Sequence, residues 1–196
     1  MTQPRGRVTV QRLLDGALEV YERSGPVGFT MTAVTEVSGV SVGSLYHHFG
    51  SFDGLAAVLY ERCMDDLLVT LIAALHRSRT ARTGTRAMAV AYLDWVAAHR
   101  TEAHFVHASA YATFVPDHAE RLAAAKLPRM LEIAAWLQPH ITERRVVDLP
   151  LPLIEMLVIG PVAETSRRWL AGAPGIDLEE AARVLPDRIW ASVRAT

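Results

Sequence analysis

Residues Thr30–Leu55 read TMTAVTEVSGVSVGSLYHHFGSFDGL, and the rest of the chain can be interpreted from this stretch. Thr30 has the side chain of a helix N-cap, and the valines after it recur on one face of a short helix over residues 31–37. Gly39 interrupts that pattern, because glycine readily adopts the positive φ that ends a helix. The first part of the stretch therefore predicts a short helix that ends in a tight turn.

A second short helix is predicted after the turn. Ser41 can cap it, so that it begins at Val42, and Leu45 and Phe49 lie four residues apart and can both face a core. Small and polar side chains remain on its outer face: Gly43, Ser44, His47 and His48, around the rim residue Tyr46. Two short helices joined by a glycine turn describe a helix-turn-helix, whose second helix enters the major groove of DNA.

Three short motifs are more specific than this spacing. They are Gly-Phe-Thr at 28–30, Ser-Gly-Val-Ser at 38–41 and Gly-x-Leu-Tyr-x-His-Phe at 43–49. Together they resemble the DNA-binding segment of the tetracycline-repressor (TetR) family. The resemblance implies an all-α chain of about nine helices. It also implies a helix-turn-helix DNA-binding domain over residues 1–52, a helical effector-binding and dimerisation domain over 53–196, and a repressor that a small molecule releases from DNA.

The resemblance also assigns roles to individual side chains. The residues that it places at the DNA are Thr30, Thr32, Ser41, Val42, Gly43, Ser44, Tyr46, His47 and His48. Ser41 and Tyr46 would contact phosphates, and Val42 could pack on a thymine methyl group. No arginine or asparagine lies on this helix, so bidentate reading of guanine or adenine is excluded and DNA shape should contribute more. The family usually has a lysine where this chain has Phe52, which removes one cationic contact with a phosphate.

The composition is that of a globular helical protein. The chain has 196 residues, of which 51% are hydrophobic and 21% charged, and alanine, leucine and arginine are frequent. Its one cysteine, Cys63, excludes an internal disulfide and favours a reducing compartment. The N-terminus lacks the apolar core of a signal peptide, and the most apolar stretch, Leu149–Ala163, is too short to span a bilayer. We therefore expect a cytoplasmic protein.

The charge balance is unusual for a DNA-binding protein. The net charge is −1, and residues 1–60 hold four arginines against five acidic residues. Phosphate affinity must then come from local placement, through helix N-termini and hydroxyl groups. Arg5 and Arg7 could reach a minor groove or a phosphate from a flexible arm over residues 1–8, or could belong to a solvated terminus. We expect weak non-specific DNA binding that salt removes easily.

Apolar periodicity predicts further helices on both sides of the motif. They cover roughly 9–24, 52–76, 85–99, 101–114, 117–138, 150–170 and 177–193. Pro128 lies inside one of them and predicts a kink or a split near residues 126–127, because proline removes a backbone hydrogen bond and clashes with the preceding turn. Pro161 and Pro186 should disturb the last two helices in the same way.

Aromatic, histidine and methionine side chains gather on the helices predicted over 85–99 and 101–114. Such a stripe is most often ordinary core. Three histidines and three large aromatic residues are polar for a core, however, and apolar walls with a few polar groups are typical of a small-molecule site. The family resemblance places an effector pocket in this region. The predicted ligand-binding residues are Met88, Tyr92, Trp95, His99, His104, His107, Tyr111 and Met130.

We predict no cofactor, no metal and no enzymatic activity. Adjacent residues such as His47 and His48 point about 100° apart on a helix and chelate one ion poorly. His104 and His107 could supply two metal ligands, but no third is evident nearby. An enzyme is the alternative class, because these histidines and Tyr111 could transfer protons. The chain lacks a Gly-rich phosphate loop, a nucleophile elbow and paired cysteines, which argues against it.

The two C-terminal helices, over 150–170 and 177–193, carry more apolar surface than one domain needs. The resemblance explains this surface as a homodimer interface, and the alternative is that these helices only close the core. A symmetric dimer would place two recognition helices on the half-sites of a palindromic operator in double-stranded DNA, about one helical turn apart. A further hypothesis is a DNA-binding regulator controlled by a protein partner or by no effector, with the pocket filled by its own side chains.

Overall fold

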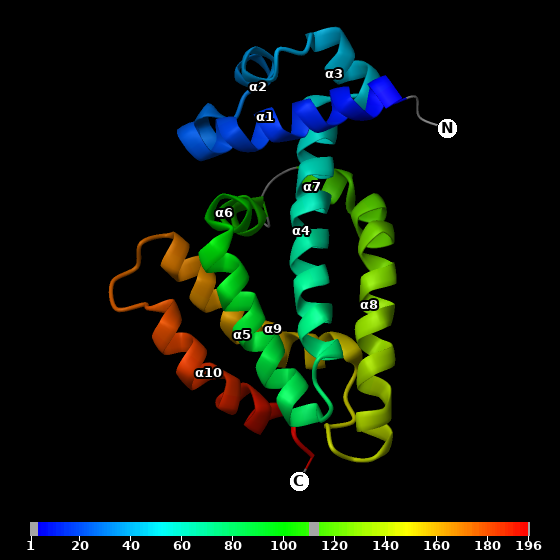
Figure 1. Ribbon diagram of the computed structural model, residues 1–196, viewed down its shortest axis with the longest axis vertical. Helices are drawn as coiled ribbons and strands as arrows, with labels where there is room; N and C mark the ends of the chain where they lie inside the picture. Colours follow the sequence, from blue (N-terminus) through cyan, green and yellow to red (C-terminus); the bar gives the residue numbers. More distant parts are fainter. Residues whose placement is uncertain (1–3, 110–113, 196) are drawn as a thin grey trace. The chain divides into compact units, whose positions relative to one another are not determined.

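The computed structural model describes residues 4–109 and 114–195 (Figure 1). Apart from one β-bridge between Val146 and Arg194, the regular structure in these ranges is α-helical. The helices are α1 (Pro4–Gly28), α2 (Met31–Ser38), α3 (Val42–Phe49), α4 (Phe52–His76), α5 (Ala81–Ala98), α6 (Arg100–Ser109), α7 (Phe114–Asp117), α8 (Ala119–Thr142), α9 (Leu151–Leu170) and α10 (Leu178–Val193). The all-α prediction is confirmed. No helix in the described ranges is long and apolar enough to cross a membrane.

The chain divides into two compact units. The first unit contains Met1–Met64 and Thr101–Ala125, and the second contains Asp65–Arg100 and Lys126–Thr196. Two helices, α4 and α8, begin in the first unit and end in the second. The functional boundary predicted between residues 52 and 53 stays a prediction. Helix α6 belongs to the same unit as the helix-turn-helix, which the sequence did not suggest.

The helix-turn-helix has the capping residues that the sequence predicts. Thr30 is the N-cap of α2 and its Oγ1 accepts a hydrogen bond from the backbone amide of Ala33 at 3.3 Å. Gly39 ends α2 with φ at 62°, in the left-handed region that favours glycine. Ser41 is the N-cap of α3 and accepts from the amide of Ser44 at 3.2 Å. Local side-chain chemistry therefore sets both ends of the turn.

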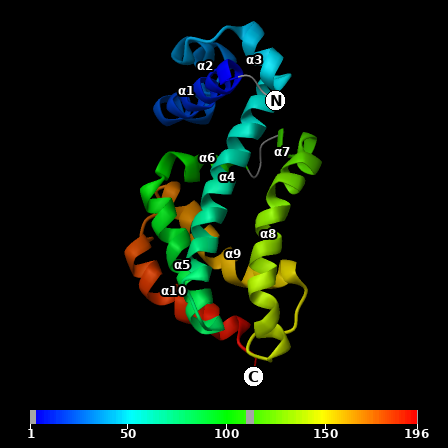
Figure 2. The same cartoon turned by 45° about the vertical axis from the view of Figure 1, so that its right-hand side comes forward.

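A layer of aliphatic side chains holds the first three helices and α4 together. Leu13, Val34, Leu45, Leu55 and Leu59 are fully buried in this core. Figures 1 and 2 show α2 and α3 on one side of α1 and α6 on the other. Because Leu45 lies in the middle of α3, its burial turns the opposite face of that helix to solvent.

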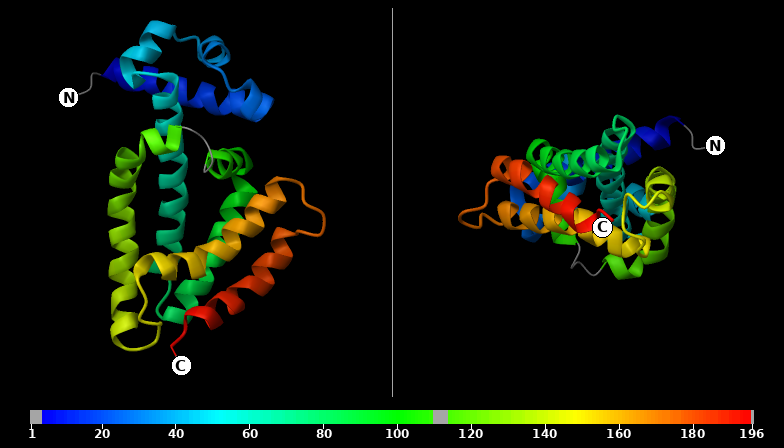
Figure 3. Two further views of the ribbon diagram at one scale, coloured as in Figure 1. Left: turned by 180° about the vertical axis from the view of Figure 1, so that it is seen from behind. Right: turned by 90° about the horizontal axis from the view of Figure 1, so that it is seen from below.

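In the second unit, α5 packs against α9 and α10, which also pack against each other (Figure 3). Thr80 and Thr83 form a reciprocal capping box at the start of α5. Asp177 caps α10, where its Oδ1 accepts from the amide of Glu180 at 2.7 Å. Gly84 of α5 is required by a close approach, because a β-carbon there would lie 2.2 Å from the Trp136 ring of α8.

Several predicted helix boundaries are wrong. Helix α1 begins at Pro4 instead of Thr9, whereas its interruption at Gly25, where φ is 61°, agrees with the predicted end at residue 24. Helix α5 begins four residues early, because the Thr80 capping box starts it. The helix predicted over 101–114 is described as α6 up to Ser109 and as α7 from Phe114, and residues 110–113 lie outside the described residues.

The proline in α8 does not split that helix. Pro128 and Pro139 both lie inside α8, which continues from Ala119 to Thr142. Pro161 and Pro186 likewise lie inside α9 and α10. Packing along these long helices outweighs the one backbone hydrogen bond that each proline removes.

Candidate DNA interface and ligand pockets

The outer face of α3 carries most of the side chains that the sequence predicts at the DNA, and Thr30 and Thr32 lie at the start of α2. Most of the nine predicted residues are exposed, and Ser44 and His48 are half-buried. On the inner face, Leu45 is fully buried and Phe49 packs against the core, so the helix cannot roll without exposing them. At its N-terminus the Ser41 hydroxyl donates to Ser44 Oγ at 3.1 Å. Contact of these residues with DNA stays a prediction.

Gly43 leaves open space at the centre of this face. A β-carbon placed there would meet no atom closer than Ser41 Oγ, at 4.0 Å. Folding therefore does not require glycine at this position, since its backbone is that of an ordinary helix. A small residue on a recognition helix lets the backbone approach the base edges, which gives Gly43 a role in binding and none in packing.

The arginines near the helix-turn-helix are largely engaged within the protein. Arg12 donates from Nη2 to the carbonyl of Ser38 at 2.7 Å, where it ties α1 to the end of α2. Arg23 forms an ion pair with Glu19 on the same helix. Arg7 is exposed. Phosphate binding would thus rely on helix N-termini and hydroxyl groups, as the charge balance of the sequence predicts.

Phe52 packs within the first unit and is not fully exposed at its surface. Its ring centroid lies 5.0 Å from that of Phe29, and the side chain is half-buried against the core. The residue that replaces the family's usual lysine therefore contributes packing and no charge. This removes one reason to expect a protein partner at that position.

A cavity in the second unit has almost entirely apolar walls. Its volume is about 70 Å³, and the lining comes from α4, α5, α8 and α9. Met88 and Met130, two of the predicted ligand-binding residues, both line it. The polar side chains among the described lining residues are Thr85 and Glu155, and Glu155 forms an ion pair with Lys126 at 3.1 Å.

The other predicted ligand-binding residues do not line this cavity. Tyr92 and Trp95 are buried on α5, where Trp95 donates from Nε1 to Asp66 at 2.7 Å. His99 stacks on Trp95, with ring centroids 5.4 Å apart. His104 and His107 lie on α6, in the first unit, and Tyr111 lies outside the described residues. The structure thus distributes the predicted cluster over two units, and its role in ligand binding stays a prediction.

Sequence reasoning missed most of the cavity wall. Trp136, Leu137, Ile154 and Val158 line it, and apolar side chains at helical spacings of one and four residues are equally typical of plain core. The close pair of Gly84 and Trp136 had no signal in the sequence, because the two residues lie far apart in the chain and meet only through packing. Within the described ranges, no three His, Cys, Asp or Glu side chains lie close enough to hold a metal ion.

An aromatic layer joins α1 to α6 within the first unit. The Tyr21 ring lies edge-on to Phe105 at 4.9 Å, and its hydroxyl is hydrogen-bonded to His104 Nδ1 at 2.9 Å. Burial raises the pKa of Tyr21 to about 12. His104, predicted as a ligand-binding residue, is therefore already used to dock α6 on the helix that supports the DNA-binding motif.

We predict that Tyr21→Phe makes the protein less sensitive to alkali. The unfolded tyrosine ionises near pH 10.0 and the folded one near 12, so the free energy of unfolding falls as pH rises between these values. In Tyr21→Phe the free energy of unfolding should fall less steeply over this pH range. Some of the fall should remain, because burial also raises the pKa of Tyr60. At neutral pH the substitution should cost about 1 kcal/mol for the lost hydrogen bond. Urea unfolding across this pH range measures the effect, and Tyr46→Phe, at an exposed position, is the control. An equal fall in the free energy of unfolding of both variants at alkaline pH would contradict the prediction.

Comparison with known proteins agrees with this geometry. The family model described as bacterial regulatory proteins, tetR family, matches residues 13–59, which span the helix-turn-helix and its supporting helices. Residues 13–59 of this chain are a TetR-family DNA-binding segment. The chain is a DNA-binding transcriptional regulator. The family is not enzymatic, so the proton-transfer hypothesis for the histidines is set aside.

Proteins similar to this chain cover most of its length. The HTH-type transcriptional regulator BetI of Paraburkholderia phymatum is 26% identical over 163 residues, which cover 83% of this chain and 80% of that protein. A putative tetR-family regulator from Shewanella has a TM-score of 0.78 at 17% identity, covering 96% of this chain and 99% of the other. FadR from Bacillus subtilis, solved in complex with stearoyl-CoA, has a TM-score of 0.76 at 14% identity, with 94% and 99% covered. The two structures show that the fold is shared.

Proposed function

We propose that this TetR-family chain is a cytoplasmic homodimeric repressor that binds a palindromic operator and is released by an apolar small molecule. The observation that carries the proposal is the apolar cavity of the second unit. Two of the four helices that line it, α4 and α8, begin in the first unit with the helix-turn-helix. A ligand that separates these helices can shift DNA affinity if it binds the two arrangements with different affinity.

The chemistry of the cavity favours an apolar effector. Leucine, isoleucine, valine and methionine side chains make up most of its wall, with Trp136 as its one described aromatic residue. The similar FadR structure was solved with an acyl-CoA, which also carries a long apolar chain. A volume of about 70 Å³ holds roughly two water molecules, so an effector must displace side chains. Met88 and Met130 suit that change, because methionine repacks readily.

The effector is tested by titrating apolar compounds, such as linear alkanoates and single-ring aromatics, into a complex with operator DNA. An effector should release the DNA and quench Trp136 fluorescence over the same concentration range. Ile159→Phe, which fills the cavity wall, should lower the apparent affinity, while Val69→Phe on the exposed side of α4 should not. Quenching that persists in Trp136→Phe would place the compound elsewhere.

A second candidate function is a regulator that answers to a protein partner or to no effector. The small volume of the cavity supports it, as do Tyr92 and Trp95, which pack in the core. If no compound in the panel both releases DNA and quenches Trp136, this second function replaces the first. The DNA-binding role is the same in both.

Dimerisation through α9 and α10 is supported by exposed apolar side chains. Leu153 and Met156 of α9 and Val184 of α10 are exposed, with Met156 at 67%. Exposed leucines also lie on α8, however, at Leu127 and Leu131. The last two helices are favoured because the family resemblance pairs them with their copies, which gives a symmetric interface.

We predict that Met156→Glu raises the dimer dissociation constant at least about tenfold, since it places a charge in an apolar interface. Leu131→Glu on α8, which is 60% exposed, is the matched control and should leave the dimer intact. Sedimentation equilibrium measures both. Dissociation by Leu131→Glu and not by Met156→Glu would move the interface to α8.

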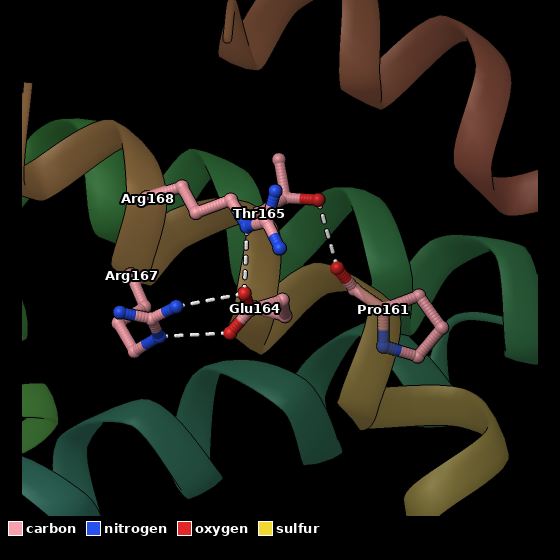
Figure 4. Close-up of polar contacts among 5 residues, drawn as sticks. All are labelled: Pro161, Glu164, Thr165, Arg167 and Arg168. Carbon is pink, nitrogen blue, oxygen red and sulfur yellow. Dashed lines mark hydrogen bonds and ion pairs between the residues drawn. The ribbon is translucent and has the colours of Figure 1, made fainter. Parts of the chain in front are cut away.

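The C-terminal half of α9 carries a charge cluster at its surface (Figure 4). Glu164 accepts hydrogen bonds from Arg167 and Arg168, at 2.8 and 2.7 Å between the nearest atoms. These bonds lower the pKa of Glu164 to about 2. Beside them, the Thr165 hydroxyl donates to the carbonyl of Pro161 at 2.8 Å.

We predict that the Glu164 carboxyl titrates near pH 2 in the folded protein. Its contribution to stability is present above the unfolded pKa of about 4.5 and is lost as pH falls towards 2. Carbon-detected NMR of the side-chain carboxyl measures the midpoint. Replacing Arg167 and Arg168 by glutamine should raise it towards the unfolded value, and Arg183→Gln on α10 should not change it. An unchanged Glu164 midpoint in the variant that lacks both arginines would contradict the assignment.

A further inference from the structure

A second cavity lies wholly within the first unit, between α1, α4, α6 and α7. Its volume is about 190 Å³, larger than that of the apolar cavity in the second unit. Five aromatic rings line it: Tyr21, Phe29, Phe52, Phe105 and Phe114. An apolar cavity of about 150 Å³ is enough to bind benzene, so this space suits a ligand with a single ring.

The aromatic rings that line the cavity differ in orientation. The Tyr21 ring lies at 83° to Phe29 and at 88° to Phe105, with centroids 5.7 and 4.9 Å apart. Phe105 and Phe114 are nearly parallel, at 6.4 Å. Rings that surround a space on several sides are the usual site for a quaternary ammonium or other organic cation, because each ring face carries partial negative charge.

One carboxylate at the cavity adds negative charge to the partial negative charge of the ring faces. Asp53, in the first turn of α4, is the only charged residue among the described residues that line the cavity. Its side chain is exposed, and its carboxylate pairs with no side chain in the described ranges. The Tyr21 hydroxyl is already bonded to His104, so it does not compete for Asp53.

We propose that this cavity binds a small organic cation, a quaternary ammonium or protonated amine attached to a single ring. The ring of the ligand lies among the five aromatic side chains, and its charge faces Asp53. Phe29 directly precedes Thr30, the cap of α2, and Phe52 opens α4, so the ligand touches the residues that flank the helix-turn-helix. The site is separate from the effector cavity of the second unit and does not depend on it.

Calorimetric titration of the full-length protein with benzyltrimethylammonium, benzyl alcohol and benzoate tests the charge preference. The cation should bind about tenfold more tightly than the neutral alcohol, and benzoate least. Asp53→Asn should remove most of that preference and leave the alcohol unchanged. Glu22→Gln, which removes an exposed carboxylate of the same unit outside the cavity, should have no effect. Equal affinities for cation and alcohol, no binding at millimolar concentration, or an unchanged preference in Asp53→Asn would overturn the proposal.

Two further readouts locate the ligand. All four tryptophans, at positions 95, 136, 169 and 190, belong to the second unit, and Trp136 lines its cavity. Binding of the cation should leave tryptophan fluorescence unchanged. Ala108→Phe, at an exposed position of the cavity wall, should weaken binding of the cation at least about tenfold. Quenching of Trp136 by the cation, or full affinity in Ala108→Phe with an unchanged melting temperature, would place it elsewhere and contradict the site.

Discussion

Leu45→Ala should lower the free energy of unfolding of the first unit by about 3 kcal/mol. Leu45 is fully buried at the centre of α3, in contact with the core that α1, α2 and α4 share. Removing its branched end leaves a cavity that the surrounding helices cannot close, since each of them is held by its own fully buried residues, among them Leu13, Val34 and Leu55. Because the same side chain anchors the recognition helix, operator affinity should fall as well.

Val42→Ala is the matched control, because it removes methyl groups from the same helix at an exposed position. It should change the free energy of unfolding by no more than about 0.5 kcal/mol. Urea denaturation followed by far-ultraviolet circular dichroism measures both variants. Equal midpoints for Leu45→Ala and Val42→Ala would show that α3 does not depend on this core.

Gly43→Leu should reduce operator affinity at least about 100-fold while leaving the stability of the protein unchanged. A β-carbon at this position meets open space, so the leucine has no neighbour in the protein to displace. On the outer face of α3 it would hold the helix away from the base edges, and contacts that depend on close approach would be lost together. Glycine in a helix is also unfavourable, so the melting temperature should not fall.

Fluorescence anisotropy on labelled operator DNA and a thermal melt measure this variant. Gly43→Ala should be intermediate, and Glu22→Leu, which adds the same side chain at the far end of α1, should bind normally. Normal affinity in Gly43→Leu would mean that the outer face of α3 does not enter the groove.

The helix-turn-helix could be predicted from the sequence because its determinants are local. Thr30, Gly39 and Ser41 act within three or four residues of themselves, and the ends of α2 and α3 agree with the prediction to within one residue. The predicted start of α5 at residue 85 is wrong, although the capping box formed by Thr80 and Thr83 is equally local. The start of α1 at Pro4 was missed because the residues before Thr9 carry no apolar stripe.

The ligand pockets could not be predicted in the same way, because they depend on which helix faces meet. His104 and Trp95 fit one aromatic stripe in the sequence, but each has a partner distant in the chain, Tyr21 and Asp66. The cavity of the second unit takes its wall from four helices that only tertiary packing brings together. Met88 and Met130 both line this cavity, since a methionine on the inner face of either helix reaches the same space, and their role in ligand binding stays a prediction.

Fluorescence anisotropy of the purified protein on DNA from just upstream of its own gene is the most direct test of DNA recognition by α3. Scrambled DNA of the same length, at two salt concentrations, is the control. We predict nanomolar, sequence-selective binding that Gly43→Leu abolishes, with weak binding to scrambled DNA that disappears at the higher salt. Equal binding to both DNAs at either salt concentration, or a Gly43→Leu variant that binds like the natural protein, would contradict this prediction.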